Sequence, residues 1–177
     1  MTGAVEVMFG CILKPCGLAV GLLAVASVVY AEDGPVVDEN IIKTCLQSAS
    51  YDTSNPACIG DAAETCMSLP DGATTFGMTS CLAAEANVWR SSLEQELAAL
   101  KAELQNYDES RAGTFTALQA QQDKAQAAWQ VYARAQCDLE VGIVIDGTIS
   151  GPTAAACEMD LLAQRTIKLR LLRRTVE

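Results

Sequence analysis

Cysteine is the residue type best suited to chemistry in this chain, which contains eight cysteines and no histidine. Cys11 and Cys16 lie in or just before an apolar N-terminal stretch, and the other six cysteines follow it. Histidine is the commonest general base and metal ligand near neutral pH, so its absence removes both roles. An even set of cysteines behind an export leader is typical of disulfides. The pattern therefore favours a stapled extracytoplasmic binding protein over an enzyme.

The export leader is predicted at residues 1–31. Residues 17–29 are apolar and mostly small, and the sequence up to Ala31 places small residues where a signal peptidase cuts. An uncleaved N-terminal anchor and a start at Met8 are the alternatives. The apolar stretch is shorter than the roughly 20 residues that span a bilayer, and we expect no membrane span in the mature chain. Cleavage near Ala31 predicts a periplasmic or secreted protein.

The six remaining cysteines are expected to form three disulfides, each at the base of a loop. The favoured pairs are Cys45–Cys58, Cys66–Cys81 and Cys137–Cys157. Six cysteines allow many connectivities, so this choice depends on where predicted helix ends meet, and Cys45–Cys66 with Cys58–Cys81 is the alternative. After residue 31 there is no Cys-x-x-Cys pair and no histidine, so we expect no metal and no cofactor.

The charge of the chain is strongly uneven. It carries 22 acidic and 12 basic residues, a formal net charge of −10. Residues 32–160 hold 20 acidic and 6 basic residues, whereas residues 161–177 hold 1 acidic and 5 basic. An acidic body argues against a nucleic-acid partner, whose phosphates need Lys and Arg. It suits a basic protein partner, or it serves solubility alone.

Helices must position these residues, because apolar side chains recur at steps of three and four along most of the chain. We predict helices over 37–48 and 57–69, a long helix from Thr74 or Thr75 to Tyr107, a second from Phe115 to Gln136, and a last one from Pro152 to Arg174. A glycine-rich loop over 142–152 is predicted to hold a brief extended piece at 143–145.

Two long apolar stripes set the predicted architecture. The first consists of Met78, Leu82, Trp89, Leu93, Leu97, Leu100, Leu104 and Tyr107. The second consists of Phe115, Leu118, Gln122, Ala125, Trp129, Tyr132 and Gln136. Such stripes must be covered, and a short connection makes their helices antiparallel neighbours. The predicted fold is therefore all-α, a disulfide-stapled helical bundle built around a long antiparallel helical hairpin.

The order of residues around four of the cysteines resembles a known family. The matching elements are Cys66, Thr75-x-x-Met78-x-x-Cys81, Gln126-x-x-Trp129-x-x-Tyr132-x-x-x-x-Cys137, Gly147-Thr148, Cys157 and Arg165-x-x-x-Leu169. This run is similar to the lysozyme inhibitor LprI-like N-terminal domain family of secreted bacterial proteins. We accordingly expect a signal peptide over 1–31, a helical and loop extension over 32–65, and an LprI-like helical domain over 66–177.

The resemblance implies a non-enzymatic extracytoplasmic binding protein. Inhibition of a basic lysozyme is the first candidate function, and a structural module that binds another envelope protein is the alternative. Lysozymes cleave with a carboxylate pair in a cleft, which an inhibitor needs only to plug or cover. Asp138, Glu140 and Asp146 are the candidate partner contacts, with ordinary solvated carboxylates as the alternative. No Ser/His or Cys/His set is present, so we expect no enzymatic activity.

The remaining motif residues have two interpretations each. Gln126, Trp129 and Tyr132 lie three apart along one helical face, which predicts either a sugar-binding platform or, preferred here, core residues with polar ends. Gly147-Thr148 predicts a tight turn beneath the disulfide in preference to a ligand contact. The basic residues of 165–174 complement the dipole of the last helix, or they touch anionic lipid or peptidoglycan.

Overall fold

The computed structural model describes residues 34–53, 55–110 and 118–177, which belong to the compact unit Asp33–Glu177. The leader predicted over 1–31 and the stripe residue Phe115 lie outside these residues. The described elements are α1 (Glu39–Ser48), the short 3-10 helix η1 (Tyr51–Thr53), α2 (Asp61–Met67), α3 (Thr75–Ser110), α4 (Leu118–Ile143) and α5 (Ser150–Val176). The prediction of an all-α, disulfide-stapled bundle is confirmed.

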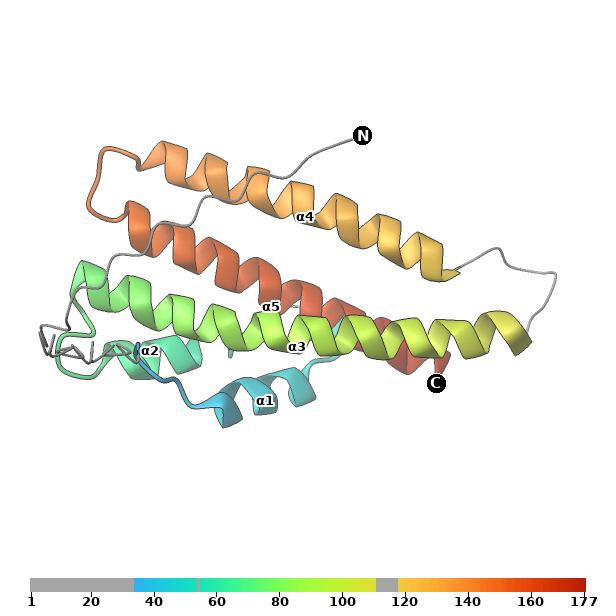
Figure 1. Cartoon of the computed structure of the whole chain (residues 1–177). Helices are drawn as coiled ribbons and strands as arrows, with labels where there is room; N and C mark the ends of the chain where they lie inside the picture. The colour runs from blue at the N-terminus through green and yellow to red at the C-terminus, as the bar shows by residue number, and fades with distance from the viewer. Residues whose placement is uncertain (1–33, 54, 111–117) are drawn as a thin grey trace, which may run out of the picture. The chain divides into compact units, whose positions relative to one another are not determined.

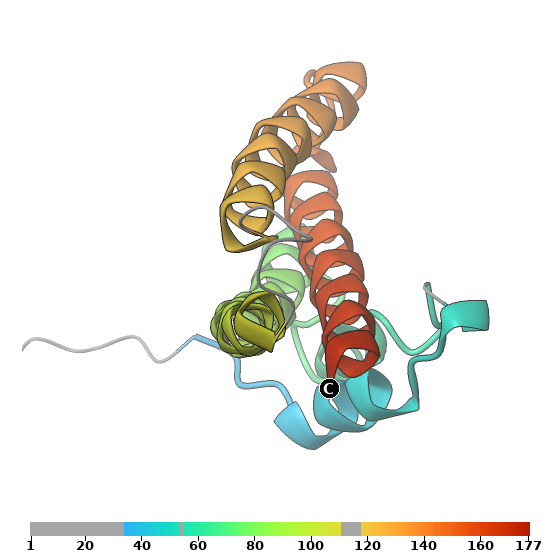
Figure 2. The same cartoon turned by 90° about the vertical axis from the view of Figure 1, so that its right-hand side faces the viewer.

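Helices α3 and α5 form the central pair of this unit. They share its most extensive contact, and they run in the same direction (Figure 1). Thr79 near the start of α3 meets Gly151 near the start of α5, and Glu96 further along α3 meets Arg170. Figure 2 shows α4 on one side of the pair and α1 with α2 on the other. Because α3 and α5 are parallel, α4 serves as the return connection between them.

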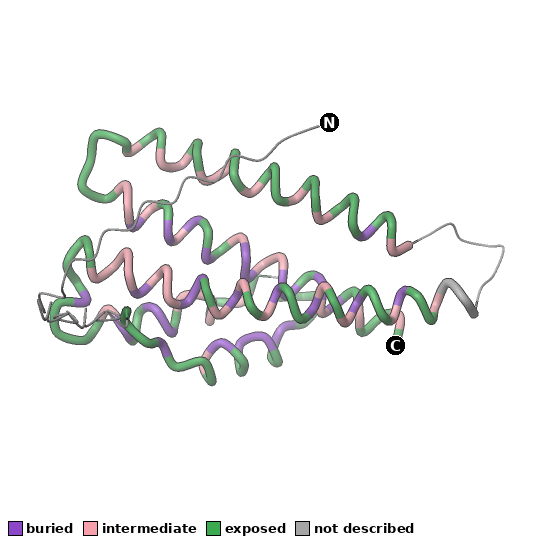
Figure 3. Tube along the Cα trace, viewed as in Figure 1, coloured by how far each residue is buried: buried purple, intermediate pink, exposed green. Residues whose placement is uncertain are grey.

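The core lies along α3 and α5 and extends under α1 and α2 (Figure 3). Its largest fully buried apolar side chains are Trp89, Ile42, Ile167 and Leu169. The predicted stripe on α3 supplies much of it, since Leu93, Leu100 and Leu104 are buried. Each such side chain contributes about 1.5–3 kcal/mol when it leaves water. The apolar stripe predicted on α3 therefore marks the buried face of this helix.

Helix α4 packs less tightly than its apolar stripe predicts. It runs antiparallel to α3, as predicted, but it contacts α5 more than α3. Gln122 is the only buried residue that the structure describes on α4. The main partner of α3 is instead α5, because α5 buries ten residues along its length.

The three disulfides have the favoured connectivity. Their Cα atoms lie 5.6 Å apart in Cys45–Cys58, 5.7 Å in Cys66–Cys81 and 5.6 Å in Cys137–Cys157. They join α1 to the turn that precedes α2, α2 to α3, and α4 to α5. Three such bonds indicate an oxidising, extracytoplasmic environment. In the part of the chain that the structure describes, no helix has both the length and the apolar composition that crossing a membrane requires.

The connection between α2 and α3 depends on a threonine cap and a glycine. The Thr74 hydroxyl accepts the Gly77 N–H at 3.0 Å and donates to the Asp71 carbonyl at 2.7 Å, so Thr74 caps α3. A Cβ on Gly77 would collide with that same Asp71 carbonyl. The turn can therefore fold back tightly only with glycine at this position.

Several predicted boundaries differ from the structure. Helix α4 continues to Ile143, seven residues past the predicted end at Gln136. The extended piece over 143–145 is wrong, because Ile143 ends α4 and residues 144–146 form a turn. The second helix is shorter than 57–69, since α2 begins at Asp61 after Gly60, which adopts a left-handed φ of 97°. Glycine reaches that φ without the penalty that a Cβ imposes.

Candidate functional site

The end of the α4–α5 hairpin gathers the residues that the sequence singled out around the glycine-rich loop. The Cys137–Cys157 disulfide ties the two helices together before the loop. Beyond it, the Val144 carbonyl accepts the Gly147 N–H at 2.8 Å and the Gly147 carbonyl accepts the Ser150 N–H at 3.4 Å. These bonds form two successive turns, and Thr148 lies exposed within them. The expected tight turn at Gly147-Thr148 is therefore present.

This turn exposes several apolar side chains. Ile143 is 77 % exposed, Ile145 62 % and Ile149 51 %, and Leu139 one turn before the end of α4 is 61 % exposed. Aliphatic side chains this exposed at one end of a helical hairpin mark a surface that a partner can cover. We call residues 139–149 the hairpin tip.

Carboxylates accompany the apolar side chains of the hairpin tip. Asp146 within the turn and Asp138 just before the tip are exposed. Glu140 is half-buried, and its Oε1 accepts a hydrogen bond from Gln136 Nε2 at 2.8 Å. The three predicted contact residues thus lie on one end of the hairpin, and Asp138 and Asp146 are the exposed members.

Two further carboxylates extend this acidic surface onto α5. Glu158 lies beside the disulfide and forms an ion pair with Arg90 of α3. The pKa of Asp160 is raised above its ordinary value of 3.8, first by loss of hydration and then by the negative charges of Glu140 and Glu85. The negative charges of Glu140 and Glu85 thus add to the lost hydration in disfavouring the ionised form of Asp160.

We expect Asp160→Asn to stabilise the protein at neutral pH. Because the folded-state pKa is raised, this group stabilises the fold below about pH 3.8, and the contribution is lost as the pH rises through the raised pKa. Asp160 is exposed, so we expect a gain below about 1 kcal/mol. Thermal unfolding at neutral pH should show a higher midpoint for the variant, and at pH below 3.8 the two proteins should coincide.

Asp146→Asn provides the matched control, since it removes one carboxylate from the exposed turn between α4 and α5. It should leave the unfolding midpoint unchanged at both pH values. An Asp160→Asn protein that is less stable at neutral pH would contradict the electrostatic argument.

The motif residues Gln126, Trp129 and Tyr132 do not share one environment. Trp129 is half-buried and packs against the core, with the Arg165 guanidinium 5.8 Å from the centre of its ring. Gln126 Oε1 accepts a hydrogen bond from Arg165 Nε at 3.0 Å, and burial lowers the pKa of Arg165. Tyr132, however, is 54 % exposed, so the preferred core assignment is wrong for this residue.

A cleft of about 580 Å³ lies between α3, α4 and α5. Leu93, Leu97 and Trp129 contribute apolar walls, and Asp138 and Gln126 lie on its α4 side. It closes at one end where Gln122 Nε2 donates to the Leu97 carbonyl at 2.9 Å. Of the predicted site residues, the cleft thus gathers Gln126, Trp129 and Asp138, but not Tyr132 or the turn. Its apolar walls and charged rim suit binding.

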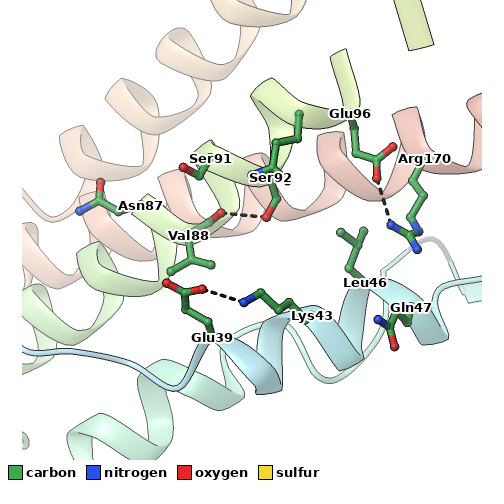
Figure 4. Close-up of a pocket in the computed structure, with 11 residues that line it drawn as sticks. Glu39, Lys43, Leu46, Gln47, Asn87, Val88, Ser91, Ser92, Glu96 and Arg170 are labelled. Atoms are coloured by element: carbon green, nitrogen blue, oxygen red, sulfur yellow. Dashed lines mark hydrogen bonds and ion pairs between the residues drawn. The ribbon is translucent and has the colours of Figure 1, made fainter. Parts of the chain in front are cut away.

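A second cleft, of about 470 Å³, lies between α1, α3 and α5 (Figure 4). The charged groups that line it are paired with one another. Lys43 Nζ lies 2.9 Å from Glu39, and Arg170 lies 3.0 Å from Glu96. Arg173 adds a second contact to Glu96 at 2.9 Å. These pairs connect neighbouring turns or helices, so we assign this cleft a structural role.

The basic C-terminal segment is used mainly inside the fold. Arg170 and Arg173 pair with the largely buried Glu96, and Arg174 donates to the Ala49 carbonyl at 3.3 Å. Arg173 and Arg174 also lie in the last turn of α5, where cations complement the helix dipole. The dipole interpretation therefore holds for Arg173 and Arg174, whereas Arg170 is used in the ion pair with Glu96.

Glu85 is the residue that sequence reasoning missed. Its side chain is fully buried, and its carboxylate accepts the Gly60 N–H at 2.9 Å, the Ala63 N–H at 2.7 Å and the Trp89 ring N–H at 2.9 Å. Two of these donors belong to the start of α2, which has no capping side chain of its own. A glutamate between Cys81 and Trp89 on the buried face of α3 was the available signal.

One comparison with known proteins gives a match. The family model described as "Lysozyme inhibitor LprI" matches residues 66–169, more than half of the chain. No curated protein and no solved structure matches. The matched residues run from α2 to α5 and include the hairpin tip and its disulfide.

Proposed function

The chain belongs to the lysozyme inhibitor LprI family, and from this premise we propose that it is a non-enzymatic extracytoplasmic protein that inhibits lysozyme by binding its cleft. The hairpin tip carries this proposal. It combines a turn fixed by the Cys137–Cys157 disulfide, exposed aliphatic side chains and exposed carboxylates. A partner with a basic rim around a substrate cleft would complement all three properties.

The tip is suited to enter a cleft because it is already ordered before binding. The disulfide and the two turn hydrogen bonds hold residues 144–149 between two helices. A segment that is fixed in its bound shape loses little conformational entropy when it binds. Rigid presentation of Ile145 therefore favours affinity without the need for a large interface.

The chemistry of lysozyme decides which side chains go where. Its cleft holds a pair of carboxylates, so a third carboxylate placed between them would be repelled. We therefore place Ile145 and Ile149 in the sugar-binding cleft. Asp138, Glu140 and Asp146 are placed against basic residues on the rim. This division uses both kinds of exposed side chain on the tip.

The overall charge supports the same partner. The net charge of −10 attracts a basic protein over long range, which speeds association at low ionic strength. Binding measured between the purified, oxidised protein and a basic lysozyme should weaken steeply as salt is added. An affinity that does not change with salt would contradict the proposal, and so would the absence of binding at a protein concentration of about 10 μM.

Removing the two carboxylates of the tip together with the adjacent Asp138 should weaken this binding. For the triple variant Asp138→Ser, Glu140→Ser, Asp146→Ser we expect an association rate lower by about tenfold at low salt, because rim charges act mainly on the rate of encounter. Stopped-flow or surface-binding kinetics would measure it.

A second triple variant separates local from global charge. Asp52→Ser, Asp61→Ser and Glu64→Ser removes three exposed carboxylates from η1 and α2, and α2 lies on the other side of the α3–α5 pair from α4 (Figure 2). It should lower the association rate by clearly less than the tip variant. Equal effects of the two variants would mean that net charge alone matters and that the tip is not the contact.

A further inference from the structure

Helix α4 carries an exposed apolar face that shares only Leu139 with the hairpin tip. The residues of this face repeat at seven-residue intervals, Ala125, Tyr132 and Leu139 in one row and Ala128 and Ala135 in the next. All five are exposed, Tyr132 by 54 % and Leu139 by 61 %. Seven-residue spacing of two apolar rows is the pattern of a helix that packs along another helix.

The structure places this face away from the packed side of α4. The half-buried residues of α4 include Gln126, Trp129 and Ala133, which lie toward α3 and α5. The residues of the apolar face, in contrast, are left to solvent along about 20 Å of helix, given a rise of 1.5 Å per residue. A sequence that keeps tyrosine and leucine on such a face is explained by a second helix that covers them.

The flanking charges identify that second helix. Lys124, Val131 and Asp138 form a third seven-residue row along one edge of the face. Val131 is 61 % exposed, and neither Lys124 nor Asp138 forms an ion pair with another described residue. The row is therefore basic at one end, apolar at its centre and acidic at the other end. Two copies of the row that run in opposite directions place the basic end of each beside the acidic end of the other.

We propose that two copies of the protein associate through this face of α4 as an antiparallel pair that crosses at Val131. Each Lys124 then lies opposite Asp138 of the second copy, and each Tyr132 lies near the small Ala128 of the second copy. The alanines permit close approach of the two helices. A two-fold contact of this kind closes on itself and stops at a dimer.

Charge also sets the direction of pairing. In a parallel pair this charged edge of one helix would face the other edge of the second helix, so Lys124 would not meet Asp138. Only the antiparallel pair brings Lys124 of each copy to Asp138 of the other. In the dimer the two hairpin tips point toward opposite ends. Asp146 in each tip stays available to lysozyme, whereas Asp138 faces Lys124 of the second copy.

Sedimentation velocity of the oxidised protein without lysozyme tests this proposal directly. The weight-average mass should rise toward twice that of the monomer as the protein concentration increases to about 100 μM. Asp138→Lys alone and Lys124→Asp alone should each weaken association by at least about tenfold. The double variant Lys124→Asp, Asp138→Lys should restore it, because the two charges simply exchange places.

Leu139→Glu is the variant that probes the apolar row, and it should leave the protein monomeric. Lys124, Asp138 and Leu139 are all exposed, so circular dichroism should show unchanged helix content for every variant. A protein that stays monomeric over the whole range would overturn the proposal. So would a dimer that persists in Leu139→Glu, or single and double charge variants that behave alike. Because no lysozyme is present, these outcomes are independent of the inhibitory function.

Discussion

Replacing Glu85 with alanine is expected to lower the free energy of unfolding by about 4 kcal/mol. The Glu85 carboxylate satisfies three donors in a fully buried position, namely the backbone N–H groups of Gly60 and Ala63 and the ring N–H of Trp89. Alanine leaves all three donors buried without an acceptor, and each costs about 1–3 kcal/mol. The vacated volume adds a smaller cost. Urea unfolding monitored by tryptophan fluorescence would measure the loss.

Two further variants define the cause of this effect. Glu85→Gln keeps one acceptor oxygen but turns an amide NH₂ toward a second donor, so we expect a loss of about 2 kcal/mol, between wild type and alanine. Glu94 lies on the same helix at an exposed position. Glu94→Ala should therefore change the free energy of unfolding by less than about 0.5 kcal/mol. If Glu85→Ala and Glu94→Ala were equally stable, the carboxylate would not hold α2 in place.

Removing the Cys137–Cys157 disulfide should produce the second large effect. This bond closes a segment with a sequence separation of 20, for which the chain-entropy model gives about 3 kcal/mol. Helix α4 depends on it more than the other helices do, because Gln122 is the only described α4 residue that is buried. Cys137→Ala with Cys157→Ala should therefore release the second half of α4 together with the hairpin tip.

Hydrogen exchange distinguishes this local release from a general loss of stability. In the Cys137→Ala, Cys157→Ala protein, amides of residues 131–149 should lose protection, while those of α3 keep it. Cys45→Ala with Cys58→Ala is the matched control, since it removes a disulfide of comparable separation, 13, at the opposite side of the central pair. That control should leave exchange in α4 unchanged. Equal exchange of α4 in both double variants would contradict the assigned role of the bond.

The sequence was sufficient for the helices and the disulfides because both depend on local patterns. Apolar spacing along α3 marks the side that Leu93 and Leu100 bury, and Thr74 with the preceding turn residues marks its start. Once helix ends are known, neighbouring cysteines at those ends are the ones close enough to bond. Local information therefore gave the elements and the links between them.

Sequence reasoning did not give the choice of partner helices. The stripes on α3 and α4 look equally able to pair, but α5 buries ten residues and displaces α4 from most of α3. That outcome depends on the relative size of three apolar surfaces, which periodicity does not measure. For the same reason Tyr132 was assigned to the core and is exposed.

The candidate site was predictable in position but not in composition. Asp138, Glu140 and Asp146 follow from their closeness in sequence to Cys137 and the turn. The exposed isoleucines that join them were expected in an extended piece, and only the observed turn places Ile145 at the end of the hairpin. Glu85 and Asp160 act through helices that are distant in sequence, so their roles required the three-dimensional arrangement.

The most direct measurement of the central claim is the rate of cell-wall hydrolysis by a basic lysozyme in the presence of the purified, oxidised protein. We predict that the wild-type protein slows hydrolysis in proportion to its concentration. Ile145→Ser, which shortens the exposed aliphatic side chain at the turn, should inhibit at least about tenfold less well, since such a contact contributes roughly 1.5–3 kcal/mol. An unchanged hydrolysis rate at saturating wild-type protein would contradict the account.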